Sequence, residues 1–369
     1  MKNGVNARLL TKPFTGIGQY TKNLFTELGE IDKENEYILV VPEKVDVHFP
    51  KNVCVKVVKE RSVGTSGMKK TWWEQITVPD FFIAQGMDAA FFTYPCNPWS
   101  KDWYKDNMKT FVTVHDCIPW MNKDYRKGLL SKLYHSQTKK AVKMADKIFT
   151  VSESSKEEIA RVCGVDREKI IVAYNDAADV YKKPVNEEVL RKVLLRFGLK
   201  RGKFALYVGG YDKRKNVPLL VKAYGEFFKK HKDIPLVLAG DCLFGGKLYD
   251  IVDENFIVKT GFLSEENLAA LYSSCAVFIN LSSQEGFNIP VIEAANCGSP
   301  IILSDIPVHR EIAGDAAIFV DLSSGGIVSA IEKMLGARKG EHLTKKLKNL
   351  SEKYSWKNCA MIIKDALIL

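Results

Sequence analysis

Two glutamates, Glu285 and Glu293, are separated by seven residues. Together with the backbone between them, the two carboxylates could bind a polyhydroxyl or anionic ligand. The apolar run at 276–281 predicts a buried strand before Glu285, whereas Pro290 is typical of the first turn of a helix. The N–H groups of residues 286 to 290 would then point out of the helix N-terminus, where they can donate to such a ligand. Each carboxylate can accept two hydroxyl hydrogen bonds, which suits a sugar and a ribose. From spacing alone an ordinary interpretation stays equally open, with Glu285 as a helix N-terminal charge and Glu293 as a solvated helix residue.

A basic loop in the same half of the chain could bind a diphosphate. Gly209 and Gly210 follow the apolar segment 204–208, and Arg214 and Lys215 stand just before a helical pattern. Arginine offers a planar fork of donors and lysine a mobile point charge, so both suit phosphate oxygens. On these residues alone, an ordinary basic surface loop is the simpler interpretation.

The N-terminal half contains two further candidate positions. His115 follows the predicted strand 110–114, at the carboxyl edge of the sheet, where ligands gather in open α/β folds. A lone histidine is nevertheless often structural. Gly16 and Gly18 lie in a glycine-rich turn before a helical pattern, and Thr21 replaces the third glycine of a dinucleotide fingerprint. A dehydrogenase is therefore not expected.

Composition indicates an ordinary globular protein. The chain has 369 residues, 46% of them hydrophobic and 27% charged, which is enough for two domains. It contains no run of about 20 apolar residues and no N-terminal signal core, so we expect neither a membrane span nor secretion. Eight cysteines without a Cys-x-x-Cys pair favour free thiols in a reducing cytoplasm and argue against a zinc site. The net charge of +10 favours anionic partners without choosing among them.

Strands alternate with helices throughout, which predicts an α/β protein of two doubly wound, Rossmann-like domains facing a cleft. The expected domains are 1–177 and 186–354, joined by a polar hinge. Residues 123–147 form a predicted basic amphipathic helix, which suits an anionic membrane surface or, equally, an ordinary solvated face. We therefore expect a cytoplasmic location, with peripheral binding to the inner face of the cell membrane as an option.

The glutamate motif, with Gly-Phe after the first glutamate and Pro-Val before the second, resembles retaining glycosyltransferases of family 4, which have the GT-B fold. The Gly-Gly…Arg-Lys-Asn pattern at 209–216 is similar to the same family. Trp-Glu-Gln at 73–75, Gly-Ile-Gly-Gln-Tyr at 16–20 and His-Asp at 115–116 look most like its bacterial mannosyltransferases. The resemblance spans nearly the whole chain and implies an N-terminal acceptor domain, onto which residues 355–369 cross back, and a C-terminal donor domain.

The resemblance also implies roles for individual residues. Arg214 and Lys215 would hold the diphosphate, Glu285 would orient the donor sugar, and Glu293 would bind the ribose. His115 would reach the sugar from the other domain, so that the implied catalytic residues are His115, Arg214, Lys215 and Glu285. The other implied donor-binding positions are Gly16, Gly18, Gly209, Gly210, Phe262, Leu263, Gly286, Phe287, Asn288 and Ile289. Asn288 departs from the family pattern, in which a glycine is commoner, and this alters the floor of the sugar pocket.

The expected activity is transfer of a hexose, with retention, from a nucleotide diphosphate sugar. Mannose from GDP-mannose is the first expectation, and a UDP-sugar is the alternative within the class. The expected acceptor is a lipid-linked or polysaccharide glycan. No Asp-x-Asp pair is present, so we expect neither a metal nor another cofactor. A catalytically silent GT-B protein that binds glycan or acts as a scaffold remains the alternative of another class. Nucleic-acid binding is not expected, because no recognised module is present.

Overall fold

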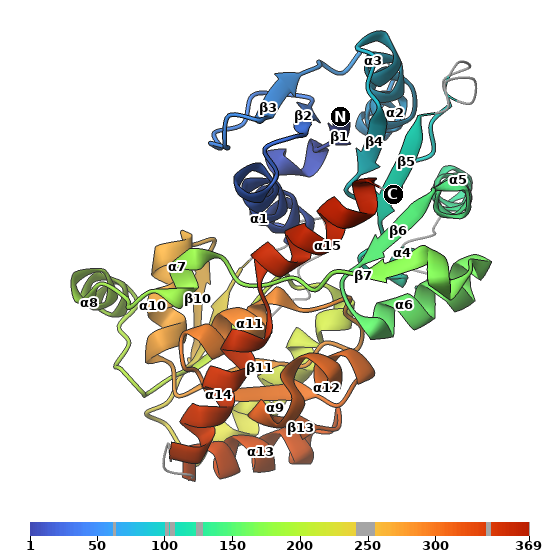
Figure 1. Ribbon diagram of the computed structural model, residues 1–369. Helices are drawn as coiled ribbons and strands as arrows, with labels where there is room; N and C mark the ends of the chain where they lie inside the picture. The colour runs from blue at the N-terminus through green and yellow to red at the C-terminus, as the bar shows by residue number, and fades with distance from the viewer. Residues whose placement is uncertain are drawn as a thin grey trace. The chain divides into compact units, whose positions relative to one another are not determined.

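The computed structural model describes residues 1–61, 64–99, 103, 108–122, 128–240, 255–336 and 341–368. The chain divides into two compact units, one of Met1–Asn175 with Ser355–Leu369 and one of Asp176–Tyr354 (Figure 1). Each unit contains one fully parallel sheet with helices packed on it. This confirms the predicted α/β class with two Rossmann-like domains.

The N-terminal unit contains a seven-stranded sheet in the order β3-β2-β1-β4-β5-β6-β7. Its strands are β1 (Lys2–Asn6), β2 (Glu36–Val41), β3 (Val53–Val57), β4 (Ala89–Phe92), β5 (Lys109–Thr113), β6 (Lys147–Thr150) and β7 (Ile170–Val172). Strands β2 and β3 extend the sheet on one side of β1, and β4 to β7 extend it on the other. The carboxyl ends of β1, β4 and β5 therefore form the edge at which such folds bind ligands.

Helices flank this sheet. They are α1 (Gly16–Ile31), α2 (Ser66–Trp72), α3 (Val78–Ala84), α4 (Ile118–Met121), α5 (Leu129–Met144), α6 (Glu153–Ile159) and α15 (Trp356–Ile368). A 3-10 turn covers Arg8–Thr11, and π-helical turns cover Trp73–Thr77 and Ala160–Gly164. Although α15 is at the end of the sequence, it packs against α1, and the ring of Trp356 lies 6.1 Å from that of Tyr20.

The C-terminal unit contains a six-stranded sheet in the order β10-β9-β8-β11-β12-β13. Its strands are β8 (Ala205–Val208), β9 (Leu236–Ala239), β10 (Ile257–Gly261), β11 (Val277–Asn280), β12 (Ile301–Ser304) and β13 (Ala317–Val320). Its helices are α7 (Asp179–Lys182), α8 (Glu187–Arg196), α9 (Val217–Phe228), α10 (Glu265–Ser274), α11 (Ile289–Asn296), α12 (Pro307–Ala313), α13 (Ser324–Gly336) and α14 (Glu341–Lys353). A 3-10 turn, Lys213–Lys215, joins β8 to α9.

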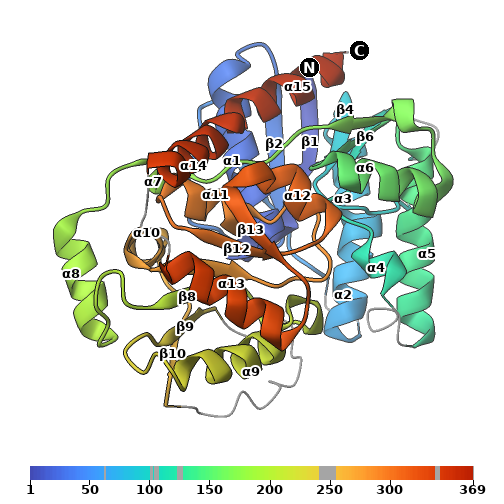
Figure 2. The same ribbon diagram turned by 90° about the horizontal axis from the view of Figure 1, so that it is seen from below.

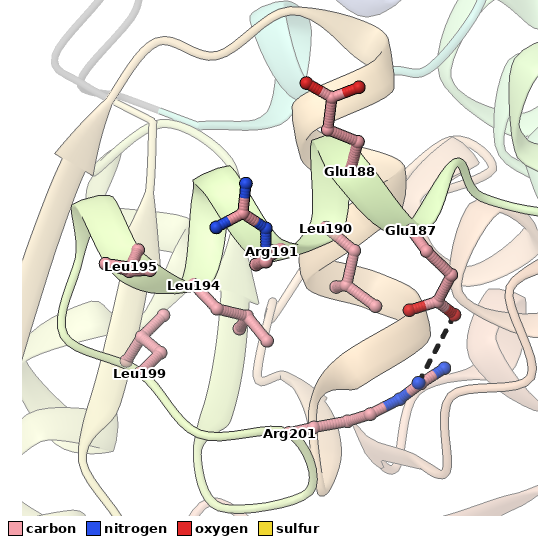
Figure 3. Close-up of a pocket in the computed structure, with 8 residues that line it drawn as sticks. All are labelled: Glu187, Glu188, Leu190, Arg191, Leu194, Leu195, Leu199 and Arg201. Atoms are coloured by element: carbon pink, nitrogen blue, oxygen red, sulfur yellow. Dashed lines mark hydrogen bonds and ion pairs between the residues drawn. The ribbon is translucent and has the colours of Figure 1, made fainter.

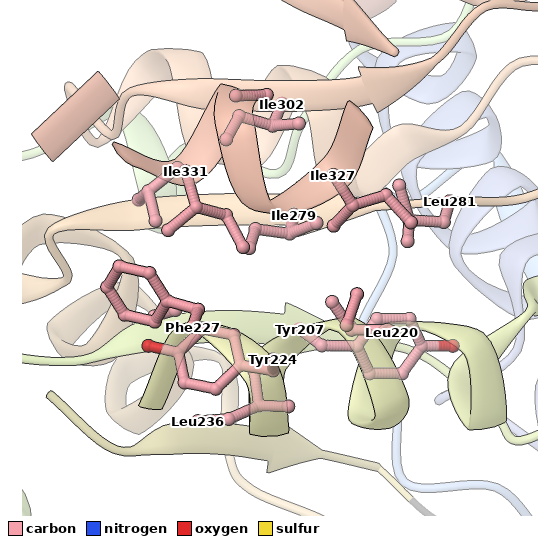
Figure 4. Packing of buried hydrophobic residues seen from close by; sticks show 14 of the residues in the cluster. Tyr207, Leu220, Tyr224, Phe227, Leu236, Ile279, Leu281, Ile302, Ile327 and Ile331 are labelled. Carbon is pink, nitrogen blue, oxygen red and sulfur yellow. The ribbon is translucent and has the colours of Figure 1, made fainter. Parts of the chain in front are cut away.

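Alternate residues of this sheet face different helical layers. Tyr207 and Ile279 pack with Tyr224 of α9 and Ile331 of α13 in one buried cluster (Figure 4). Phe278, next to Ile279, faces the other side, where its ring contacts Tyr272 of α10. Figure 2 shows the strands between α9 and α13 on one side and α10, α11 and α12 on the other. Burial on both faces explains why these strands are almost wholly apolar.

Three local features complete the description of the chain path. After Asn6, at the end of β1, the chain turns directly into the 3-10 segment Arg8–Thr11. Pro79 occupies the first turn of α3, where its missing N–H costs no hydrogen bond. The unit boundary falls after Asn175, and the expected hinge contains α7, where Lys182 pairs with the fully buried Asp176.

The predicted basic helix at 123–147 corresponds in part to α5. Residues 123–127 lie outside the described part of the chain. Across the described ranges, no helix combines the length and apolar character needed to cross a bilayer.

Candidate functional site

The ends of β8 and β9 approach each other closely through two glycines. A Cβ on Gly240 would lie 2.2 Å from the carbonyl oxygen of Gly209, so no other residue fits there. Gly209 itself adopts a φ of 144°, which side chains rarely allow. The Tyr207 hydroxyl donates to the carbonyl of Gly210 at 2.6 Å and fixes the path of the loop toward Arg214.

Arg214, Lys215 and Glu285, which are predicted site residues, form one ion cluster. Arg214 Nη1 lies 3.0 Å from Glu285 Oε2, and Lys215 Nζ contacts Glu285 Oε1. Arg214 Nη1 also donates to the carbonyl of Gln284 at 3.0 Å, and Ser283 N donates to the carbonyl of Arg214 at 2.7 Å. These contacts join the loop after β8 to the loop after β11, so residues 70 positions apart in sequence share one site.

Glu285 remains ionised although its side chain is largely buried. Burial alone would raise the pKa of Glu285, but the charges of Arg214 and Lys215 outweigh this effect and hold it well below its usual range. Burial lowers the pKa of Lys215, and Glu285 opposes that shift. Two cations held by one carboxylate at a strand end can bind a phosphate-rich ligand.

Glu293 lies on α11 and is only 8% exposed, so the interpretation as a solvated helix residue is wrong. The Tyr272 hydroxyl donates to Glu293 Oε2 at 2.9 Å. Burial raises the pKa of Glu293 to about 7, although the hydrogen bond from Tyr272 opposes this shift. Near neutral pH this carboxyl therefore exchanges between an acceptor-only and a protonated form.

The loop between these glutamates packs inward. Gly286 and Phe287 are buried, and the Phe287 ring lies 5.4 Å from that of Tyr354. Asn288 adopts the left-handed conformation, with φ 80°, immediately before Ile289, where α11 begins. Its Nδ2 atom lies 2.8 Å from Nε2 of His309, a buried residue for which the sequence carried no signal beyond a lone histidine.

Phe262 and Leu263 follow β10, whose last residue, Gly261, has a φ of 66°. Phe262 is 46% exposed, and Leu263 is half-buried. A large exposed aromatic ring at a strand end has the size and shape that stacking on a base requires.

In the N-terminal unit, His115 lies just beyond the carboxyl end of β5. Its Nε2 donates to the carbonyl of Thr93 at 2.9 Å, which leaves Nδ1 as the acceptor nitrogen. The Tyr20 ring meets the imidazole edge-on at 4.7 Å. Burial lowers the pKa of His115 to about 4, so the ring is neutral near pH 7.

Gly16 and Gly18 lie in the first turn of α1 rather than in a loop before it, and Thr15 caps this turn. A Cβ on Gly18 would lie 2.5 Å from the carbonyl oxygen of Lys12, whereas one on Gly16 would meet nothing within 4 Å. Packing therefore explains Gly18, and the open space beside Gly16 leaves room for a ligand.

The Trp-Glu-Gln segment forms a buried cluster. Trp73 is fully buried, and Glu74 beside it is equally buried. Tyr94 and Tyr134 donate to Glu74 at 2.7 Å and 3.2 Å, and Lys70 Nζ lies 3.7 Å away. This buried carboxylate was not among the predicted site residues, although the motif marked its position.

A shallow groove beside α8 contains none of the predicted site residues (Figure 3). Leucines of α8 line it, and an exposed ion pair between Arg201 and Glu187, 3.4 Å apart, crosses its edge. It is therefore not the candidate site. Among the described residues, no three histidine, cysteine or acidic side chains are grouped so as to hold a metal ion.

Comparison with known proteins identifies the family. Residues 196–355 match the family model described as glycosyl transferases group 1, and residues 14–175 match that of Glycosyltransferase Family 4. O-antigen chain mannosyltransferase RfbU of Salmonella typhimurium is 30% identical over 86% of each chain. The chain belongs to glycosyltransferase family 4. This glycosyltransferase is also 27% identical to O-antigen chain mannosyltransferase B of Escherichia coli, over 67% of its own length and 66% of that relative.

Solved structures agree with the architecture of this glycosyltransferase. Anabaena HepE, solved in complex with UDP and glucose, matches it with a TM-score of 0.74 at 13% identity, covering 100% of this chain and 99% of that one. The two Rossmann-like parallel sheets and this likeness confirm the GT-B fold. Arg214, Lys215, Glu285 and Glu293 all lie within the C-terminal matched region, and His115 lies within the N-terminal one.

Proposed function

We propose that this glycosyltransferase transfers mannose from GDP-mannose to a lipid-linked or polysaccharide glycan, with retention of anomeric configuration and without a metal ion. The ion cluster of Arg214, Lys215 and Glu285 carries the proposal, because it places two cations at the carboxyl edge of the sheet in the C-terminal unit. The names of the relatives, both O-antigen chain mannosyltransferases, support the sugar and the kind of acceptor.

In the proposed reaction the bond between the anomeric carbon and the diphosphate oxygen breaks, and an acceptor hydroxyl forms the new glycosidic bond. The diphosphate leaves with the electron pair, and the acceptor proton passes to it. Arg214 and Lys215 stabilise the charge that develops on the leaving group. Glu285 orients the sugar, Glu293 accepts hydrogen bonds from the ribose, and the neutral His115 offers a further acceptor for the sugar.

A UDP-sugar is the second candidate donor. HepE, which shares the fold, was solved with UDP and glucose, and the proposed contacts of the cluster involve only the diphosphate, which GDP and UDP have in common. A silent scaffold is the remaining alternative, and the charged, largely buried cluster argues against it because such a cluster is costly to keep without a ligand.

Nucleotide binding tests the proposal. A ligand at a hundred times its dissociation constant stabilises a protein by about 2.7 kcal/mol, which a thermal unfolding scan detects readily. We expect GDP to raise the melting temperature more than UDP, ADP or dTDP does, and Arg214→Ala to abolish the shift. Arg191→Ala, which removes an exposed arginine from α8, is the matched control and should retain it.

Activity completes the test. GDP-mannose carrying a labelled mannose should transfer label to a lipid or glycan acceptor from a membrane extract, and the product should be α-linked if the donor's configuration is retained. A rise in melting temperature with UDP alone would indicate a UDP-sugar donor and leave the proposed glycosyl transfer in place. Folded protein that shows no shift with any nucleotide would overturn the proposal in favour of the silent scaffold.

A further inference from the structure

The buried side chains of Ser304, His309 and Asn288 are linked by hydrogen bonds. The donor and acceptor of each bond can be assigned, starting from Ser304. The Ser304 hydroxyl donates to the carbonyl of Ser282, which can only accept. This bond uses the one hydrogen that the Ser304 hydroxyl possesses. Ser304 Oγ can therefore act only as an acceptor toward its other neighbour, His309.

The position of the proton on His309 follows from this direction. His309 Nδ1 lies 2.9 Å from the carbonyl oxygen of Ser304 and 3.1 Å from its hydroxyl, and both are acceptors here. Nδ1 must then carry the hydrogen. Burial lowers the pKa of His309, so the ring is neutral and Nε2 is an acceptor.

The tautomer of His309 in turn orients the amide of Asn288. Because Nε2 accepts, the atom of Asn288 that lies 2.8 Å from it must be the donor Nδ2. The planar amide then directs Oδ1 away from His309. Asn288 is only 6% exposed, and its Oδ1 has no hydrogen-bond partner among the residues that the structure describes. A buried acceptor without a partner is rare in folded proteins.

Asn288 is unusual in a second, independent way. It is one of two described residues other than glycine with a positive φ, a conformation that glycine adopts without strain. Asn288 also follows Glu285 of the ion cluster on the same short loop, which leads into α11. A strained residue with an unsatisfied acceptor thus lies beside the proposed donor site.

We propose that Asn288 is a specificity-determining residue whose Oδ1 accepts a hydrogen bond from a hydroxyl of the donor hexose, and that His309 is the positioning residue that holds the amide in this orientation. The inference rests on the proposed function, since it assigns a contact within the same donor site. An amide oxygen accepts from a sugar hydroxyl but only repels an ionised phosphate, which offers no hydrogen. The contact therefore recognises the sugar and not the diphosphate.

Asn288→Gly tests this contact, because glycine keeps the left-handed conformation and removes the amide. Calorimetric titration should give an affinity for GDP within twofold of the parent protein. The affinity for GDP-mannose should fall at least tenfold, with UDP and UDP-glucose as the pair to use if those are the ligands that the parent protein binds. Equal affinities of variant and parent for the nucleotide sugar, or an equal loss for nucleotide and nucleotide sugar, would overturn the inference.

Deoxy donors identify the hydroxyl. Among GDP-mannose analogues that lack one hydroxyl each, one should bind the parent protein at least tenfold more weakly than GDP-mannose does. The same analogue should bind Asn288→Gly as well as GDP-mannose does. A deoxy profile that is unchanged in the variant would overturn the inference. If the parent protein binds no nucleotide at all, the proposed function itself fails, and this outcome is distinct from the others.

Two variants of His309 separate positioning from simple packing. His309→Leu removes the acceptor that holds Asn288, so the deoxy profile should flatten as it does in Asn288→Gly, and the double variant should lose nothing more. His309→Gln can offer an amide oxygen to Asn288 Nδ2 and should restore most of the discrimination. If both variants kept the parent profile, or if the double variant lost affinity additively, His309 would not position the amide.

Discussion

At the scale of single residues, Glu293 gives the protein a measurable pH dependence. Its carboxyl has an ordinary pKa of 4.5, which burial raises to about 7 in the folded state. Between these values the folded state holds a proton that the unfolded state releases, so this group makes the protein less stable as pH rises from about 4.5 to 7. We expect Glu293→Gln, which keeps an acceptor for Tyr272, to be more stable than the parent above pH 7 and equal to it near pH 4.5.

Urea unfolding at several pH values measures this difference. If Glu293 binds the ribose in its ionised form, GDP affinity should also rise as pH passes about 7, and Glu293→Gln should lose that rise. The comparison of variant and parent isolates Glu293, because titration of the GDP phosphates changes the affinity of both proteins equally. A parallel pH dependence of stability in variant and parent would contradict the assignment.

Residue types could be predicted from the sequence only where a motif carries them. The Glu-x7-Glu spacing and the Arg-Lys pair marked Glu285, Arg214 and Lys215, which the fold brings into one cluster, and the family match supports their importance. His309 could not be predicted, because a single histidine in a short amphipathic helix has no spacing that distinguishes it. Its proposed role in orienting Asn288 depends on the hydrogen bond between Ser304 and Ser282, which forms only when β11 pairs with β12.

At the scale of elements, the strands were the most predictable part of the protein. Apolar runs such as 277–280 identified them because both faces of each sheet are covered, so every residue of the run is buried. The π-helical turn Trp73–Thr77 was not predictable. Its extra residue changes no local preference, and it is held by tertiary contacts of Glu74 with Tyr94 and Tyr134.

The element α5 carries a prediction about membranes. We propose that its exposed side chains, which include Lys132, Lys140 and Lys143, bind an anionic lipid surface. The apolar side chains of Leu133 and Met144 are also exposed, at 49% and 47%. Each lysine near such a surface contributes about 1 kcal/mol. Replacing all three by glutamine should therefore weaken binding to vesicles containing phosphatidylglycerol by about a hundredfold.

The control must remove the same charge elsewhere. Lys222, Lys229 and Lys333 are exposed on or beside α9 and α13, so their replacement by glutamine lowers the net charge equally. This control should bind the vesicles nearly as the parent does in a sedimentation assay. Equal weakening by both triple variants would mean that overall charge, and not α5, drives the association.

At the scale of the whole molecule, the two units differ in how the chain builds them. The C-terminal unit is one continuous segment, Asp176–Tyr354, whereas the N-terminal unit needs Met1–Asn175 together with Ser355–Leu369. The last helix, α15, packs on α1, and Cys359 and Trp356 are buried in that unit. The N-terminal unit therefore cannot complete its core until residues 355–369 have been made.

This asymmetry predicts that residues 176–354 fold alone and bind the nucleotide. The fragment contains a complete six-stranded sheet and the whole cluster of Arg214, Lys215 and Glu285. Its affinity for GDP should therefore lie within about threefold of that of the full chain, and Arg214→Ala should abolish binding in both. Residues 1–175 alone lack α15 and leave apolar surface of α1 uncovered, so they should be less stable than the same unit in the full chain.

Circular dichroism measures the stability of the two fragments, and calorimetric titration measures their affinity for GDP. A synthetic peptide of residues 355–369 can be added to each fragment to supply the missing helix α15. The peptide should raise the melting temperature of 1–175 and leave that of 176–354 unchanged, because its buried contacts belong to the first unit. A C-terminal fragment that folds but does not bind GDP would place essential nucleotide contacts outside that unit. Donor recognition would then depend on residues of both units, and the ion cluster could not account for it alone.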